Sequence, residues 1–127
     1  MEQSIESRKR MSAKLKTQFP NHVPVFVRPL PTSKNAPMIR KKQFIIATDL
    51  AASLLLIKIR QHITLNAEQG LFFLLDVSKT EWNESKKQLI MLDSVQTMGT
   101  IANQALKEDG FIYLYYDTEN AFGHSIK

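Results

Sequence analysis

The chain contains no cysteine among its 127 residues. This excludes a disulfide, a thiolate nucleophile, a zinc ribbon and any cysteine-ligated cluster. Glycine is also scarce, and the four glycines are too far apart to form a G-x-G-x-x-G or P-loop cradle for a nucleotide phosphate. The three histidines, His22, His62 and His124, show no pair with the spacing of ligands on one helix, so we expect no metal site.

Long apolar runs are missing as well. The purest runs, Leu71–Leu75 and Leu54–Ile57, are far shorter than the roughly 18–20 residues that span a bilayer. The first residues lead into Arg8-Lys9-Arg10 without the apolar stretch of a secretory signal. We therefore expect any membrane attachment to come from outside the chain. No Ser-His-Asp arrangement or carboxylate pair indicates an enzyme.

Positive charge is concentrated at the front of the sequence. The net charge is +5, and residues 1–42 contribute ten Lys and Arg against two acids, whereas residues 43–127 contribute seven against ten. This distribution predicts an acidic partner: nucleic acid, anionic lipid or an acidic peptide. Phe19, Phe26 and Phe44 near the basic residues suit a nucleic-acid surface, but a solvated helix face above core aromatics explains them better.

The apolar spacing predicts an α+β fold of the β-grasp type, in which one helix crosses a four-stranded mixed sheet. The segment 77–91 is charged and contains Trp82, which favours an exposed loop or a short surface helix. The expected elements are a helix over 2–18, strands over 22–30 and 43–47, a mostly buried helix over about 50–62 capped by Thr48-Asp49, a central strand over 71–75, a short helix over 98–105 and a last strand over 111–116.

Five stretches of the sequence, taken together and in order, are similar to one known family. They are Gln18–Val27, Lys42–Leu50, Thr97–Gly99, Glu108–Tyr116 and the ending Glu119-Asn-Ala-Phe-Gly123. In these stretches the chain resembles the autophagy-related protein 8 family of ubiquitin-like modifiers. The resemblance implies an N-terminal helical extension over residues 1–20, a ubiquitin-like β-grasp domain over 21–117 with an insertion at about 78–91, and a flexible tail over 118–127.

The resemblance gives the tail a function. It implies that a processing cysteine protease cuts between Gly123 and His124, directly after Phe122, and that E1-like and E2-like enzymes then transfer Gly123 to phosphatidylethanolamine. The chain is then a substrate without catalytic groups or a cofactor of its own. It is expected in the cytoplasm, and after lipidation on the autophagosome membrane. Glycine suits this position because it can thread a narrow enzyme cleft.

The resemblance also implies a groove in which cargo receptors and adaptors bind through aromatic-x-x-aliphatic motifs that pair with the strand at 43–47. Lys41 and Lys42 would attract acidic residues that flank the motif. The aromatic pocket would use Leu15, Pro24, Phe26, Ile45 and Phe111, and the aliphatic pocket Phe44, Ile46, Leu50 and Leu55. The competing interpretation is that all of these residues are core.

Four positions depart from the family pattern near this groove. Met11, Gln43 and His22 replace charged residues, and Lys58 replaces an aliphatic one, so the motif preference is expected to differ from that of relatives. Two other functions remain open. One is a modifier that is conjugated to a protein, and the other is a basic nucleic-acid-binding module, although no nucleic acid is expected. The basic N-terminal segment, residues 1–42, could also contact microtubules or lipid.

Overall fold

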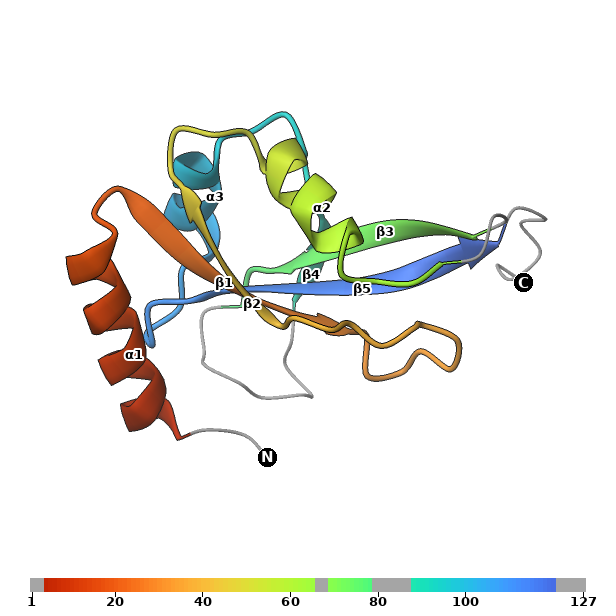
Figure 1. The fold of residues 1–127 in the computed structure, drawn as a ribbon, viewed down its shortest axis with the longest axis horizontal. Coiled ribbons are helices and arrows are strands. Elements are labelled where there is room, and N and C mark those ends of the chain that lie inside the picture. Colours follow the sequence, from red (N-terminus) through yellow and green to blue (C-terminus); the bar gives the residue numbers. More distant parts are fainter. Residues whose placement is uncertain (1–3, 66–68, 79–87, 121–127) are drawn as a thin grey trace.

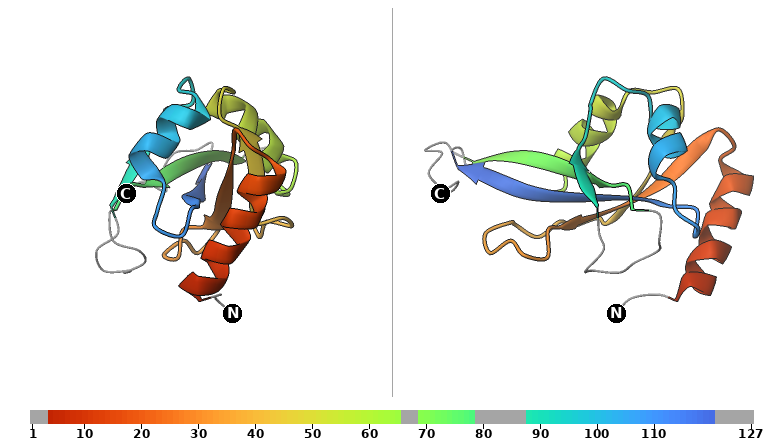
Figure 2. Two further views of the ribbon diagram at one scale, coloured as in Figure 1. Left: turned by 90° about the vertical axis from the view of Figure 1, so that its left-hand side faces the viewer. Right: turned by 180° about the vertical axis from the view of Figure 1, so that it is seen from behind.

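A computed structural model describes residues 4–65, 69–78 and 88–120. Five strands form one mixed sheet in the order β2-β1-β5-β3-β4. Helices α2 and α3 cover one face of the sheet, and α1 lies at one end of it (Figures 1 and 2). The elements are α1 (Ile5–Gln18), β1 (His22–Pro29), β2 (Gln43–Ala47), α2 (Ala52–Arg60), β3 (Gln69–Asp76), β4 (Leu89–Met91), α3 (Met98–Ala105) and β5 (Ile112–Asn120).

The two strands at the centre of the sheet come from the two ends of the fold. β1 pairs with β5 in parallel, and β2 and β3 pair antiparallel to them on the outside. The α+β β-grasp class predicted from the sequence is therefore confirmed, but the sheet has five strands rather than four. The additional strand, β4, lies in a segment expected to be a loop or surface helix, and its three residues are too few to show an alternating pattern.

The main core lies between the sheet and the helices α2 and α3. Alternate residues of the strands point into it because successive side chains of a strand face opposite sides. In β2, for example, Phe44 and Ile46 are buried whereas their neighbours are only half-buried. The side chains that α2 and α3 bury against this face are Ala52, Leu55, Ile59, Met98, Ile101 and Ala105.

A second apolar cluster covers the opposite face of the sheet. Phe111, Tyr113 and Tyr115 are buried there, and Met11 and Leu15 of α1 pack against them. The residues between these three point into the main core, so the stretch 111–116 is buried throughout. The continuous apolar run of the last strand is therefore explained by burial on both faces.

Three boundaries differ from those predicted. α2 begins after Ala51, which makes no side-chain cap, because Thr48 and Asp49 belong to the turn that leaves β2, where the Thr48 amide donates to the Asn21 carbonyl. The helix is also less buried than expected, since its outer side is exposed. β5 continues to Asn120, which is three residues into the segment predicted to be tail.

Pro24 lies in β1 without costing the sheet a hydrogen bond. The amide of Val27 donates to the Lys42 carbonyl, so odd-numbered residues of β1 bond to β2 and even-numbered residues face β5. The register with β5 begins only at Val25. The missing amide of Pro24 therefore faces a position that lies before the paired stretch of β1 and β5, where a proline is tolerated.

A buried ion pair joins the end of β3 to the loop that precedes β5. The Nζ atom of Lys107 lies 3.3 Å from an Asp76 carboxylate oxygen and donates to the Ser78 carbonyl at 2.7 Å. Both charged side chains are almost fully buried. Because each buried charge has a partner of opposite sign, the pair avoids the large cost of an isolated one.

Tyr116 connects β5 to the loop before β2. Its hydroxyl donates to the Pro37 carbonyl, and burial raises the pKa of the phenol above 10.0. Above that pH the unfolded chain loses this proton while the folded chain keeps it, so stability falls as the pH rises.

We expect Tyr116→Phe to lower the free energy of unfolding by about 1 kcal/mol at neutral pH, the usual value of one hydrogen bond. The variant should lose less stability than the parent between neutral pH and a pH above 10.0. Urea unfolding of both proteins at the two pH values measures this. A parallel decline in the two proteins would contradict the assignment of the titration to Tyr116.

Candidate functional site: an open sheet edge beside a basic pocket

β2 forms an open edge of the sheet. It pairs with β1 on one side, and within the described part of the chain no strand pairs with its other side. Since Lys42, Phe44 and Ile46 hydrogen-bond toward β1, the amides and carbonyls of Gln43 and Ile45 point outward. This edge can therefore accept another strand through backbone hydrogen bonds.

The residues predicted to form an aromatic pocket come together where α1 meets this edge. The ring of Phe26 stacks on that of Phe111 with centroids 4.3 Å apart, and Leu15 packs against the same cluster. Ile45 lies opposite Pro24 in the strand register. Phe111 and Pro24 are buried, so the surface of this cluster comes from the half-buried side chains of Leu15, Phe26 and Ile45.

The residues predicted to form an aliphatic pocket divide differently. Phe44, Ile46 and Leu55 are 4%, 2% and 0% exposed and belong to the main core. For these three the competing interpretation, that they are core residues, agrees with the structure. Leu50 is 38% exposed and is the one member of the set with a substantial surface. The alternation of β2 explains the burial of Phe44 and Ile46.

Two exposed apolar residues beside Leu50 were not predicted. Leu54 and Ile57 of α2 are 43% and 55% exposed. Leu54 and Ile57 are three positions apart in α2, which places their side chains on one face of the helix, and Leu50 lies in the turn just before α2. That spacing was present in the sequence, but the uniformly apolar composition of the helix hid which face is buried. Lys58, the departure from the family pattern, is also exposed.

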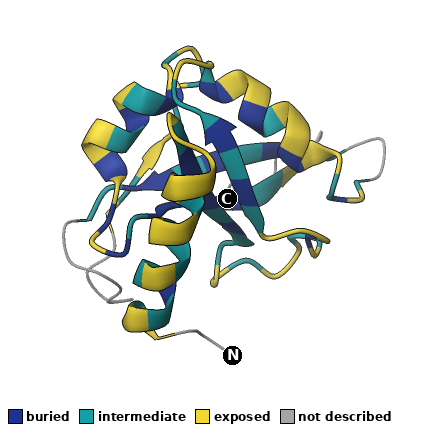
Figure 3. Ribbon diagram, turned by 60° about the vertical axis from the view of Figure 1, so that its left-hand side comes forward, coloured by how far each residue is buried: buried dark blue, intermediate teal, exposed yellow. Residues whose placement is uncertain are grey.

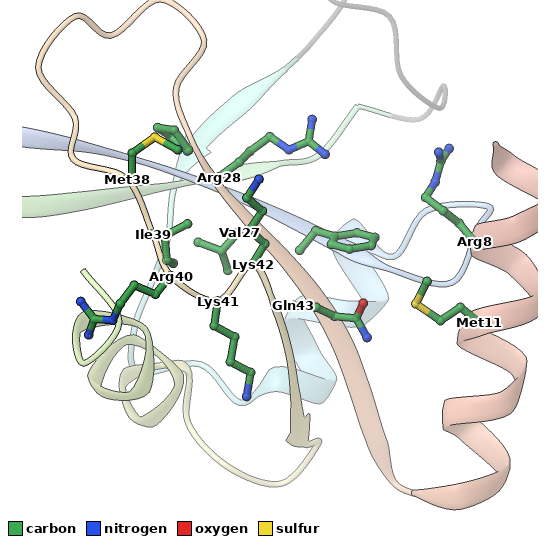
Figure 4. Close-up of a pocket in the computed structure, with 12 residues that line it drawn as sticks. Arg8, Met11, Val27, Arg28, Met38, Ile39, Arg40, Lys41, Lys42 and Gln43 are labelled. Atoms are coloured by element: carbon green, nitrogen blue, oxygen red, sulfur yellow. The ribbon is translucent and has the colours of Figure 1, made fainter. Parts of the chain in front are cut away.

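A pocket of about 770 Å³ lies between α1 and the loop that precedes β2. Arg8 and Met11 of α1 stand on one side of it, and the residues from Met38 to Lys42 stand on the other (Figure 4). It shares Phe26 with the predicted aromatic pocket. The residues that line it are Arg8, Met11, Phe26, Val27, Arg28, Pro29, Met38, Ile39, Arg40, Lys41, Lys42 and Gln43.

Five of these lining residues carry a positive charge and none carries a negative one. Arg40 donates to the carbonyl of Gln61 at 2.5 Å and to Thr64, which holds its guanidinium toward α2. The ammonium of Lys41 lies 5.0 Å from the centre of the Phe44 ring. Lys41 and Lys42 thus lie next to the first residue of the open edge, and the pocket is suited to an anionic ligand.

Comparisons with known proteins identify the family. Residues 7–123 match the family model described as "Autophagy protein Atg8 ubiquitin like". The chain belongs to the Atg8 family. It is 28% identical over 125 residues to autophagy-related protein 8e of Arabidopsis thaliana, covering 98% of this chain and 92% of that protein. It is 30% identical over 120 residues to autophagy-related protein 8 of Schizosaccharomyces pombe, covering 94% and 88%.

The fold agrees with a solved structure of the family. The crystal structure of Trypanosoma brucei ATG8 superimposes with a TM-score of 0.73 at 25% identity, covering 97% of this chain and 95% of that one. The resemblance deduced from the sequence is therefore confirmed, and the chain is a ubiquitin-like autophagy protein of the Atg8 family.

In this Atg8-family chain, α1 is held to the domain by a buried ion pair in addition to the packing of Met11 and Leu15. Arg8 is its only buried side chain, and its Nε atom donates to Asp109 at 2.7 Å. Asp109 also accepts from the Tyr113 hydroxyl and from the amide of Phe111. Most of the helix is exposed or half-buried, as Figure 3 shows. No pattern in the sequence indicates this ion pair, because its partners lie 101 residues apart.

Some predicted sites lie outside the described residues. They are the cleavage and conjugation positions Phe122, Gly123 and His124, and Trp82 of the expected insertion. No helix in the described ranges is long and apolar enough to cross a bilayer. Those ranges also hold no group of three acidic or histidine side chains placed to bind a metal ion.

We expect Arg8→Ala to lower the free energy of unfolding by about 3 kcal/mol, because it leaves the buried Asp109 carboxylate without its counter-charge. Lys9→Ala is the matched control. It removes the exposed pair with Glu108, whose atoms are 3.2 Å apart, and should cost less than about 1 kcal/mol. Urea unfolding of both variants measures the difference, and equal losses would contradict the importance assigned to the buried pair.

Proposed function

We propose that this chain is a lipid-conjugated autophagy modifier that captures linear peptides on the open edge of β2. The observation that carries the proposal is the outward direction of the Gln43 and Ile45 backbone groups beside the apolar cluster at α1. A peptide that adds as a strand would obtain its affinity from these backbone groups and its specificity from neighbouring side chains.

The geometry of the edge supports an aromatic-x-x-aliphatic motif. In an extended peptide, residues three positions apart point to opposite faces of the sheet. One face of β2 presents the half-buried Leu15, Phe26 and Ile45, and the other face leads to the exposed Leu50 and Leu54 next to α2. An aromatic and an aliphatic residue at this spacing would therefore each meet an apolar surface.

The basic pocket supports a preference for acidic flanks. Arg40, Lys41 and Lys42 lie directly before the first residue of the edge. Acidic residues at one end of a bound peptide would face these charges, which accelerates association more than it raises affinity. Cargo receptors and adaptors that carry such motifs are the partners we propose.

The C-terminal sequence supports lipid conjugation. The ending Glu119-Asn-Ala-Phe-Gly123 lies within the part of the chain that matches the family model. We propose that a cysteine protease frees Gly123, that E1-like and E2-like enzymes activate it, and that it forms an amide with phosphatidylethanolamine. The two acyl chains would anchor a cytoplasmic protein stably on autophagosomal membranes, because one chain gives only marginal binding.

Gly123→Ala should block cleavage and leave the protein off membranes, because a Cβ at this position obstructs a narrow enzyme cleft. Ser125→Ala, two residues further on, is the control and should be processed normally. Intact mass after expression in the native cells checks this. The parent should lose His124–Lys127 and gain the mass of a phospholipid, whereas a protein adduct would support the protein-conjugated alternative instead.

Gln43→Pro tests the open edge. Proline removes the outward amide of the first strand residue, which β1 does not use, so the fold should be retained. We expect the Kd for a peptide with an aromatic-x-x-aliphatic motif to rise about tenfold, with Gln43→Ala close to the parent. Titration calorimetry measures both, and equal affinities for the parent and the proline variant would refute strand addition at this edge.

A further inference from the structure

A serine of α1 is packed against the loop that leads into β5. The Ser12 hydroxyl lies 2.6 Å from the Asp109 carbonyl oxygen, to which it donates. A Cβ atom on Gly110 would lie 2.4 Å from the Ser12 oxygen, and Gly110 has a φ of +90° that favours glycine. The backbone at Asp109 and Gly110 is therefore packed directly against the hydroxyl of the half-buried Ser12 when α1 is docked.

The residues before Ser12 form a recognition sequence for an enzyme with an acidic substrate cleft. Arg8, Lys9 and Arg10 precede it by four, three and two positions. Charge patterns of this kind determine which substrates a protein kinase selects. In the docked helix Arg8 is buried in its pair with Asp109, whereas Lys9 is exposed. A transient opening of α1 gives a kinase access to Ser12 and all three cations, and the modification then prevents the helix from docking again.

We propose that Ser12 is a phosphorylation site whose modification releases α1. In the reaction the Ser12 oxygen attacks the γ-phosphorus of Mg-ATP, a new O–P bond forms, the bond to the β-phosphate breaks, ADP leaves, and the hydroxyl proton passes to the base of the kinase. The product carries a charge of about −1.5 to −2. A phosphate on Ser12 would replace the hydrogen bond to the Asp109 carbonyl and press against the Gly110 backbone, so the modified helix cannot dock as before.

The phosphate also removes the ion pair that holds the helix. Arg8 lies four residues before Ser12, on the same side of α1. A phosphate on Ser12 would bind the Arg8 guanidinium in competition with Asp109, and its negative charge would repel the Asp109 carboxylate. Loss of Arg8 leaves that carboxylate buried without its counter-charge, and the release of α1 lets water reach it.

Release of α1 would alter the peptide groove. The helix supplies Leu15 and Met11 to the cluster around Phe26 and Phe111. Without α1, the apolar surface on this face of β2 loses one wall. This consequence rests on the proposed peptide-binding function, whereas the modification of Ser12 and the undocking of α1 do not.

The experiment treats the folded full-length chain with Mg-ATP and a serine kinase selective for basic residues before the serine. We expect one phosphate on Ser12, located by peptide mapping, and none on Ser12→Ala. Hydrogen exchange should then accelerate at least about tenfold at the Phe111 amide, which donates to Asp109, and throughout α1. The Kd for the motif peptide should rise about tenfold or more.

Two variants serve as mimic and control. Ser12→Glu should accelerate exchange in α1, whereas Ala13→Glu, which adds the same charge at the adjacent exposed position, should not. Phosphorylation of the heat-unfolded chain alone, or a phosphorylated protein with unchanged exchange, overturns the proposal. Failure of the unmodified protein to bind the peptide counts against the proposed function and leaves the exchange result decisive for Ser12.

Discussion

The parallel pairing of β1 with β5 is the constraint on which the rest of this structure depends. It places the first and last strands of the fold side by side within the sheet, with β2 next to β1 and β3 next to β5. β1 has β2 on one side and β5 on the other, and in the described ranges no strand pairs with the outer side of β2. The same pairing puts Phe111 next to Phe26 and thereby forms the apolar cluster beside that free side. The open edge and its apolar surroundings thus have one origin.

The groove combines a rigid part with a part that is held more loosely. β1, β2 and the buried rings belong to a sheet covered on both faces. The helix that completes the groove buries only one of its side chains, Arg8, and depends on a carboxylate from the far end of the sequence. Charge-dependent attachment of one wall makes the groove sensitive to any change in charge at α1. The buried sheet does not share this sensitivity.

The elements that could be predicted from the sequence are those with a clear local pattern of apolar residues. β2 was predicted with its observed bounds, Gln43–Ala47, because an apolar run stands between Lys41-Lys42 and a turn. β4 was not predicted because its three residues are too few to show the alternation of apolar and polar side chains that is typical of a strand. The family resemblance supplied the positions of the groove, but not which of its members are surface. Leu55 could not be told from Leu54 without knowing where the sheet lies.

Contacts between residues far apart in the chain could not be predicted from the sequence. Arg8 and Asp109 show no spacing that links them, and charged residues are ordinarily expected at the surface. The same holds for Lys107 and Asp76, which are buried together although each stands in a polar segment. The basic pocket was foreseen only in part, since Lys41 and Lys42 were named while Arg8, Arg28 and Arg40 were not.

The Lys107–Asp76 pair has a consequence for how this fold varies. Lys107 fixes the backbone at Ser78, and the Val77 amide bonds to the Gln88 carbonyl, so the connection between β3 and β4 is closed at its base. These two anchors hold the ends of β3 and β4 together by themselves. A longer insertion between them would therefore cost only the slowly rising entropy of loop closure, and the register of the two strands would be kept.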